Sequence, residues 1–227
     1  MLQNRPFMIA LEGNIAAGKS TILDYLSTFN DVTTLKEPLE KWCNFNGKNL
    51  LQKMYNDEIS SLAFQSYIQT TRFKILKTDI KSSILIVERS LLSNQNIFLK
   101  KDLSEGKISQ LEIDILRENE ELLNNFIHTK PDVIFYLQTD PETAYKRLKL
   151  RDRSEEKHCN FKLLKDLHSL HEKWLNNKEN DVKVEVINAN IDIVNLKPVL
   201  NNKIQNYKKM LATLKLSKVL QARSPAL

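Results

Sequence analysis

The stretch Gly13-Asn14-Ile15-Ala16-Ala17-Gly18-Lys19-Ser20 matches the phosphate-loop pattern G-x-x-x-x-G-K-[ST] without a gap. Its flanks also fit, because an apolar run at 7–12 predicts a buried strand and residues 20–29 have the apolar spacing of a helix. Glycines let the backbone turn its N–H groups toward phosphate oxygens, and a helix N-terminus adds partial positive charge. The stretch therefore predicts a nucleotide-phosphate loop between a strand and a helix.

The polar loop residues have separate expected tasks. We expect Lys19 to bridge the β- and γ-phosphates of ATP and the Ser20 hydroxyl to ligate Mg²⁺. The other positions expected to contact ATP are Gly13, Asn14, Ala16, Ala17, Gly18 and Thr21. The loop alone leaves the acceptor open, because ATPases, GTPases and small-molecule kinases share it. A guanine-reading Asn-Lys-x-Asp pattern does not occur after a predicted strand, which disfavours a GTPase.

Segments with strand and helix patterns alternate along the rest of the chain. Apolar runs predict strands at 32–36, 83–88, 133–137 and 184–187. Apolar spacing predicts helices at 50–80 (interrupted near Asp57), 109–127, 161–175 and 193–214, and Pro141 after Asp140 begins another. The alternation predicts an α/β fold, with a parallel five-stranded sheet covered by helices on both faces. We expect one domain over 1–227, an Arg-rich lid near 147–158 and a frayed tail at 215–227.

Composition limits the classes of protein and of partner. The chain has 227 residues, 41% of them hydrophobic, and a net charge of +6 at pH 7. No run approaches the roughly 18 consecutive apolar residues of a membrane span, and no signal peptide or organelle presequence is visible, so we expect a cytoplasmic or nuclear protein without membrane contact. Its two cysteines are expected as free thiols. Arginines do not alternate with aromatic residues, so we expect no nucleic-acid partner.

Charged residues gather where strands are expected to end, and the ends of parallel strands are where α/β sites form. Glu37 follows one predicted strand and precedes Pro38, so its carboxylate could take a proton from an acceptor hydroxyl. Glu88 and Arg89 end the most apolar strand, where a carboxylate could reach Mg²⁺. Arg147, Arg151 and Arg153 would supply positive charge to a transferring phosphoryl group. Each group taken alone also fits a solvated loop, a surface ion pair or a solvated helix end.

Six motifs occur in a fixed order between about residues 8 and 175. They are Glu12-Gly13-Asn14-Ile15-Ala16-Ala17-Gly18-Lys19-Ser20-Thr21, Glu37-Pro38-Leu39-Glu40-Lys41-Trp42, Asn49-Leu50-Leu51-Gln52-Lys53-Met54-Tyr55, Phe64-Gln65-Ser66-Tyr67, Glu88-Arg89-Ser90 and Arg151-Asp152-Arg153-Ser154-Glu155-Glu156. Together they resemble the deoxyribonucleoside kinases of the deoxycytidine, deoxyguanosine and insect multisubstrate type. The resemblance implies transfer of the γ-phosphate of ATP to the 5′-hydroxyl of a deoxyribonucleoside, with Mg²⁺, in a homodimer.

The resemblance also implies roles for individual residues. Glu37 would be the general base on the 5′-hydroxyl, Arg89 would hold that hydroxyl and the incoming phosphate, and Lys19 would bind phosphate. Ser20 and Glu88 would serve Mg²⁺, and the lid arginines would clamp the phosphoryl group. The substrate contacts would come from Tyr55 and Glu156 on the 3′-hydroxyl, Gln65 on the base edge, Trp42, Phe64 and Phe98 as walls, and Ile15, Leu39, Leu51 and Met54 as lining. The turn with Asn190, Ile191 and Asp192 would lie against adenine.

Two positions bear on base preference. Arg72 resembles the arginine of the deoxycytidine and deoxyguanosine kinases, whereas Asn94 falls where those relatives have Asp. An Asn carries no charge to pair with Arg72, so we expect a freer guanidinium and a relaxed preference. Deoxycytidine is the expected substrate, purine deoxynucleosides are possible, and thymidine is disfavoured because Arg72 narrows the space for its methyl group.

Two other functions fit parts of the sequence. A nucleoside monophosphate kinase of the thymidylate kinase type shares the fold, the loop and the lid, but it would place the Glu37 carboxylate beside a dianionic acceptor. A regulator that binds ATP without transfer would need no catalytic groups, although Lys19, Glu37, Glu88 and Arg89 are all present.

Overall fold

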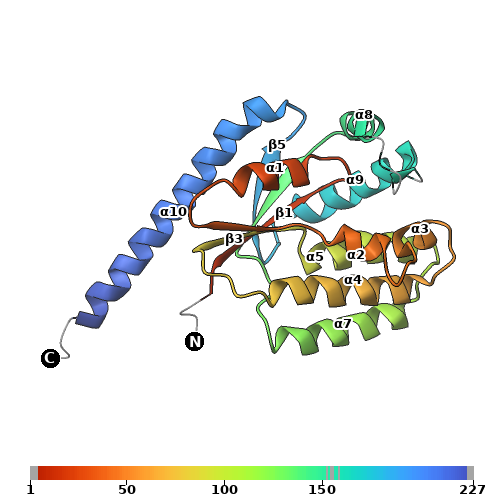
Figure 1. Cartoon of the computed structure of the whole chain (residues 1–227), viewed down its shortest axis with the longest axis horizontal. Helices are drawn as coiled ribbons and strands as arrows, with labels where there is room; N and C mark the ends of the chain where they lie inside the picture. Colours follow the sequence, from red (N-terminus) through yellow and green to blue (C-terminus); the bar gives the residue numbers. More distant parts are fainter. Residues whose placement is uncertain (1–4, 152, 154–155, 158, 224–227) are drawn as a thin grey trace.

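A single sheet of five parallel strands, in the order β2-β3-β1-β4-β5, forms the centre of the computed structural model (Figure 1). The strands are β1 (Phe7–Gly13), β2 (Val32–Leu35), β3 (Ile84–Glu88), β4 (Val133–Gln138) and β5 (Lys183–Asn188). The structure describes residues 5–151, 153, 156–157 and 159–223, without the side chains of 218–223. The predicted parallel five-stranded sheet is therefore confirmed, with strand ends within one residue of those expected.

Helices connect the strands. They are α1 (Lys19–Leu26), α2 (Leu39–Cys43), α3 (Leu50–Tyr55), α4 (Ser61–Leu76), α5 (Leu91–Ser93), the π-helical segment η1 (Asn94–Phe98), α6 (Leu99–Ser104), α7 (Gln110–Asn124), α8 (Pro141–Arg151), α9 (Phe161–Leu175) and α10 (Ile193–Arg223). The predicted interruption near Asp57 is confirmed, because it separates α3 from α4. The helices at 39–43 and 91–104 were not predicted.

Both faces of the sheet are covered by apolar side chains, because successive strand residues point to opposite faces. On one face, Ile9, Leu11 and Ile86 are fully buried under α1 and α10. On the other face, Ala10 and Tyr136 pack with residues of α9 and with Ile97 of η1. Burial on both sides explains why β1, β3 and β4 read as continuous apolar runs.

Helix α10 is longer than predicted. It continues to Arg223, where the sequence analysis expected a frayed tail from residue 215, and residues 224–227 lie outside the described part of the chain. Residues 199–223 contain neither glycine nor proline, so nothing in the sequence ends the helix there. The last turns of α10 extend away from the sheet (Figure 1). None of the helices in the described ranges has the length and apolar composition that crossing a membrane requires.

Candidate active site

The phosphate loop joins β1 to α1 and adopts a conformation that its residue types permit. Gly13 has φ +148° and Gly18, at the start of α1, has φ +95°. A Cβ on Gly13 would lie 2.8 Å from the Leu137 carbonyl oxygen, so no larger residue fits there. Asn14 donates from Nδ2 to the Leu164 carbonyl (2.8 Å) and accepts at Oδ1 from the Ile15 amide (2.8 Å). The Asn14 side chain therefore ties the loop to α9.

Lys19 lies inside the curve of this loop. Its Nζ donates to the carbonyl oxygens of Gly13 (3.1 Å) and Asn14 (2.8 Å). Burial, with the nearby Arg89 charge, lowers the pKa of Lys19 to about 7. A phosphate group would favour the charged form of this lysine.

Ser20 and Glu88 lie together beside the loop. The Ser20 Oγ donates to Glu88 Oε1 (3.0 Å), and the Glu37 amide donates to Glu88 Oε2 (3.3 Å). A hydroxyl and a carboxylate oxygen are the kind of ligand that Mg²⁺ prefers. The donor set at this edge of the sheet therefore fits the magnesium site expected from the sequence.

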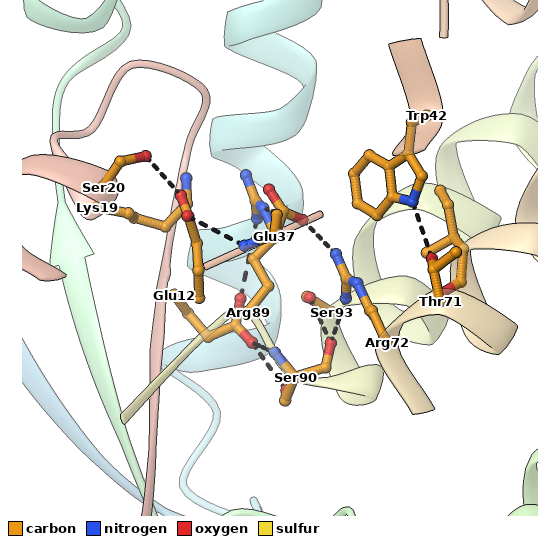
Figure 2. A network of polar contacts seen from close by, with 12 residues as sticks. Glu12, Lys19, Ser20, Glu37, Trp42, Thr71, Arg72, Arg89, Ser90 and Ser93 are labelled. Atoms are coloured by element: carbon orange, nitrogen blue, oxygen red, sulfur yellow. Dashed lines mark hydrogen bonds and ion pairs between the residues drawn. The ribbon is translucent and has the colours of Figure 1, made fainter. Parts of the chain in front are cut away.

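Glu37 is held between two arginines, as Figure 2 shows. Its Oε1 forms an ion pair with Nη2 of Arg72, and Arg89 Nε lies 3.6 Å from the same oxygen. The three side chains are largely buried, and Glu37, the most open, is 12% exposed. The Glu37 carboxylate is thus held in a fixed position, at the wall of a cavity that the phosphate loop also lines.

Arg89 follows β3 with a left-handed backbone (φ +59°), which is uncommon for a non-glycine residue. Its amide donates to the Leu11 carbonyl (3.1 Å), which holds the backbone in place. Its guanidinium lies 5.0 Å from the Phe98 ring centroid and 3.4 Å from His171 Nε2. Because His171 Nδ1 faces the Leu167 carbonyl (2.6 Å) and burial lowers the pKa of the ring well below its usual value, the neutral ring accepts from Arg89.

Glu12 completes this polar cluster below Arg89 (Figure 2). It is fully buried and accepts from the Ser90 amide (2.7 Å) and the Ser90 hydroxyl (2.8 Å). Its Oε2 lies 3.8 Å from Arg89 Nη1, and burial raises the pKa of the carboxyl. Sequence reasoning assigned no role to Glu12 or His171, whose partners lie far away along the chain.

One cavity of about 680 Å³ connects the phosphate loop with α2, α3 and α4. It brings together most of the predicted residues. They are Ile15, Ala16, Gly18, Lys19, Ser20, Glu37, Leu39, Trp42, Leu51, Met54, Tyr55, Phe64, Gln65, Arg72, Glu88, Arg89, Phe98, Arg151, Arg153 and Glu156. Trp42 is fixed by a hydrogen bond from Nε1 to the Thr71 hydroxyl (2.9 Å) and by an edge contact with Phe64. The volume and apolar walls of this cavity suit a ligand the size of a nucleoside.

Asn94 lies elsewhere than predicted. It is fully buried in η1, is not among the residues found to line the cavity, and its two amide atoms have no hydrogen-bond partner among the described residues. Arg72 is also not free, because it binds Glu37 and donates from Nη1 to the Ser90 carbonyl (2.7 Å). The expectation of a freer guanidinium is therefore wrong, since Glu37 takes the place of the missing carboxylate.

The lid residues have separate contacts. Arg151 forms an ion pair with Glu156. The Cys159 thiol lies 3.5 Å from the Tyr55 hydroxyl. Burial raises the pKa of that hydroxyl well above its usual value. Arg147 is not among the residues found to line the cavity, and it donates to the carbonyls of Ala189 (2.8 Å) and Ile191 (3.1 Å). Arg147 thus holds the turn expected near adenine. The lid residues Asp152, Ser154, Glu155 and His158 lie outside the described residues.

That turn, between β5 and α10, is ordered by hydrogen bonds to the residue before α8 and to the first turn of α10. Asn190 Oδ1 accepts from the Asp140 amide (2.9 Å), and the Asp192 carbonyl accepts from the first turn of α10. Ile191 is partly open to solvent. The turn is not found among the cavity walls, nor are Gly13, Asn14, Ala17 and Thr21 of the loop.

Gln65 has a partner that the sequence analysis did not anticipate. Its Nε2 donates to Asp102 Oδ2 (3.1 Å), and Ser61 donates its hydroxyl to the same oxygen. Asp102 belongs to the unpredicted helix α6 and lines the cavity beside Gln65. No strand-end or motif signal marks Asp102, so only the fold reveals it.

The family model for deoxynucleoside kinases matches residues 9–212. The chain therefore belongs to the deoxynucleoside kinase family, as the ordered motifs indicated.

Curated relatives have names consistent with this family. Human mitochondrial thymidine kinase 2 is 39% identical over 169 residues, which cover 74% of this chain and 64% of that protein. Mitochondrial deoxyguanosine kinase of Xenopus laevis is 35% identical over 201 residues, covering 78% and 76% of the two chains. Human deoxycytidine kinase is 34% identical over 194 residues, covering 74% of each. The three names differ in the nucleoside, so similarity does not select the base.

Proposed function

We propose that this protein transfers the γ-phosphate of ATP to the 5′-hydroxyl of a deoxyribonucleoside, giving the 5′-monophosphate for nucleotide salvage. One observation carries the proposal: a largely buried carboxylate, Glu37, lies in the same cavity as the phosphate loop and an aromatic pocket. A phosphoryl donor on Lys19 and a nucleoside against Trp42 would both face that carboxylate. Family membership supports the same reaction.

The chemistry follows from the placement of charges. The 5′-oxygen forms a bond to the γ-phosphorus, the bond from that phosphorus to the bridging oxygen of ADP breaks, and Glu37 takes the hydroxyl proton. Lys19 and Arg89 would stabilise negative charge on the transferring group, together with Arg151 and Arg153 of the lid. Ser20 and Glu88 would hold Mg²⁺, which supplies positive charge to the phosphates when bound.

The preferred base is proposed to be cytosine. The guanidinium of Arg72 lies over the Trp42 ring (5.8 Å to the centroid). It narrows the pocket on that side and so leaves less space for the methyl group of thymine. Purine deoxynucleosides are secondary candidates. Because Asn94 is not among the residues found to line the cavity, we propose that Arg72 and other residues of the cavity wall carry this preference.

The first experiment is a substrate panel. Purified protein with ATP and Mg²⁺ receives deoxycytidine, deoxyguanosine, deoxyadenosine or thymidine, and ADP release is followed. Turnover with deoxycytidine above the others supports the proposal. Silence with all four nucleosides but turnover with dTMP or dCMP would assign the protein to the monophosphate kinases. ATP binding without any turnover would assign it to the non-catalytic regulators.

A homodimer is also proposed, with α7 at the interface. Leu111 (71% exposed), Ile115, Leu122 and Phe126 (73% exposed) present apolar surface on one stretch of the molecule. Ile108, just before α7, is instead buried against Leu99 and Leu116. A cytoplasmic location is likewise proposed, although two of the relatives above have names that place them in mitochondria.

A further inference from the structure

Asp102 and Gln65 form a buried polar pair on the wall of the nucleoside cavity. Asp102 is 8% exposed, Gln65 is 2% exposed, and both line the cavity. Ser61 and Gln65 both donate to Oδ2 of Asp102. The Gln65 Oε1 has no hydrogen-bond partner within the described ranges of the chain. The glutamine is therefore fixed at its nitrogen end and unsatisfied at its oxygen end.

The hydrogen bond to Asp102 allows the Gln65 amide only one orientation. A carboxylate accepts hydrogen bonds only, so the NH₂ group of Gln65 must face Asp102. Rotating the amide by half a turn would place Oε1 against Oδ2, two acceptors in a buried setting, which is costly. The nearby cations do not relieve this, because Lys101 pairs with Glu105 and Lys107 pairs with Asp57 (2.7 Å).

An amide of fixed orientation distinguishes two classes of base. Cytosine and adenine present a ring-nitrogen acceptor next to an exocyclic amine donor, whereas thymine and guanine present a ring N–H donor next to a carbonyl acceptor. The order of donor and acceptor along the edge is therefore opposite in the two classes. A freely rotating glutamine can serve both classes, and one with its nitrogen end fixed serves one of them.

We propose that Asp102 is a specificity-determining residue, which positions the Gln65 amide so that the cavity selects cytosine and adenine, in which a ring-nitrogen acceptor lies next to an exocyclic amine, over thymine and guanine. This rests on the proposed function, since it assumes a nucleoside in this cavity. Cytosine and adenine are favoured for two reasons. The unsatisfied Gln65 Oε1 needs a hydrogen-bond donor, and the negative charge of Asp102 disfavours carbonyl oxygens at the same wall of the cavity. Asp102 acts through Gln65 and takes no part in phosphoryl transfer.

The test measures the dissociation constants of deoxycytidine and thymidine by calorimetry, in the wild type and in Asp102→Asn. An Asn can donate or accept, so Gln65 could then adopt both orientations. We expect the wild type to bind deoxycytidine more tightly and the ratio of the two constants to shrink by about tenfold or more in the variant. The matched control is Glu105→Gln, which removes a carboxylate charge from the next turn of the chain without touching Gln65, and it should keep the wild-type ratio.

A double-variant cycle separates positioning from a general structural effect. In a Gln65→Ala background, Asp102→Asn should no longer change the ratio, because no amide remains to be oriented. The inference is overturned by a wild type that binds thymidine at least as tightly as deoxycytidine, by a ratio unchanged in Asp102→Asn, or by an equal change in Glu105→Gln. Since binding is measured without turnover, a protein that binds nucleosides but transfers no phosphate would refute the proposed function and leave this inference standing.

Discussion

The carboxylate of Glu37 gives the sharpest prediction at the scale of single residues. Glu37→Gln keeps the shape and an acceptor for Arg72 but removes the proton acceptor, so kcat should fall on the order of 10²–10⁴-fold. The dissociation constant of ATP should stay close to wild type, because the described contacts of the Glu37 carboxylate are with Arg72 and Arg89 and not with the loop. Steady-state kinetics and ATP titration measure the two quantities. An unchanged kcat would remove Glu37 from the mechanism.

Lys19 gives a pH-dependent prediction. Its pKa is lowered to about 7 by burial, and bound phosphate favours the charged form, so the pKa rises when ATP binds. Between the two pKa values, binding takes up a proton, and the affinity for ATP should therefore fall as pH rises above about 7. Calorimetry in two buffers of different ionisation enthalpy detects the proton uptake. Lys19→Arg is the control. The guanidinium of the arginine is charged before and after ATP binds, so this variant should show no proton uptake. An ATP affinity that is constant from pH 7 to pH 9 would contradict the prediction.

Residues within motifs could be identified from the sequence, whereas residues that act through distant partners could not. Lys19, Ser20 and Glu88 were identified because a contiguous loop or a strand end fixes their surroundings. Glu12 stood within a motif but was given no role, and His171 was missed, because their contacts, to Ser90 and Arg89, depend on chain folding. For the same reason, position along the chain does not say whether Asn94 of η1 lines the cavity, and it is not among the lining residues found.

At the scale of elements, regular strands and amphipathic helices were predictable and the segment at 91–104 was not. Leu91, Ile97 and Leu99 are buried there, a spacing that departs from the three- and four-residue steps of an α-helix. The π-helical turn at Asn94–Phe98 explains the departure, because a π-turn holds more residues than an α-turn. Phe98 at the end of this turn and Asp102 on the helix that follows line the cavity.

The attachment of β5 to α10 makes a prediction about acid stability. Glu185 on β5 accepts from Lys183, from Lys203 and from the Tyr207 hydroxyl (2.6 Å), and these partners outweigh partial burial to lower its pKa to about 2. A lowered pKa stabilises the fold above the unfolded value near 4.5, and the contribution disappears as pH falls through about 2.

Glu185→Gln should therefore lower the urea midpoint at pH 7, and its difference from wild type should shrink between pH 4.5 and pH 2. Glu118→Gln, at an exposed site on α7, serves as the control and should leave the midpoint close to wild type. A difference from wild type that is the same at pH 7 and at pH 2 would show that Glu185 contributes through packing and not through its charge.

At the scale of the whole molecule, a parallel sheet covered on both faces followed from the alternation of patterns, but the order of the strands and the mode of association did not. The homodimer was implied by the resemblance alone. Apolar residues on and beside α7 face both ways, with Ile108 buried and Leu111 exposed, so periodicity alone could not say which face α7 keeps open. Helices α4 and α7 lie side by side along one edge of the molecule (Figure 1). This edge is where we expect a second copy to bind.

The proposed homodimer is tested by charge placed on that edge. The double variant Leu111→Asp/Leu122→Asp should change a dimer into a monomer in analytical ultracentrifugation while circular dichroism stays unchanged, because both side chains are exposed in the monomer. Leu150→Asp, at an 87% exposed apolar residue on α8, should remain dimeric. A monomeric wild type at micromolar concentration would dismiss the dimer.

The position of Arg72 has a consequence for how substrates are discriminated. One of its nitrogens binds Glu37 while its guanidinium lies over Trp42, so one cation borders both the aromatic wall and the proposed proton acceptor. A nucleobase that displaces this guanidinium also breaks the ion pair that holds the Glu37 carboxylate in place. Poorly fitting nucleosides would then be discriminated by slow turnover more than by weak binding. Tight binding of a nucleoside analogue would therefore not by itself predict phosphorylation. An analogue that binds tightly and turns over slowly acts as an inhibitor.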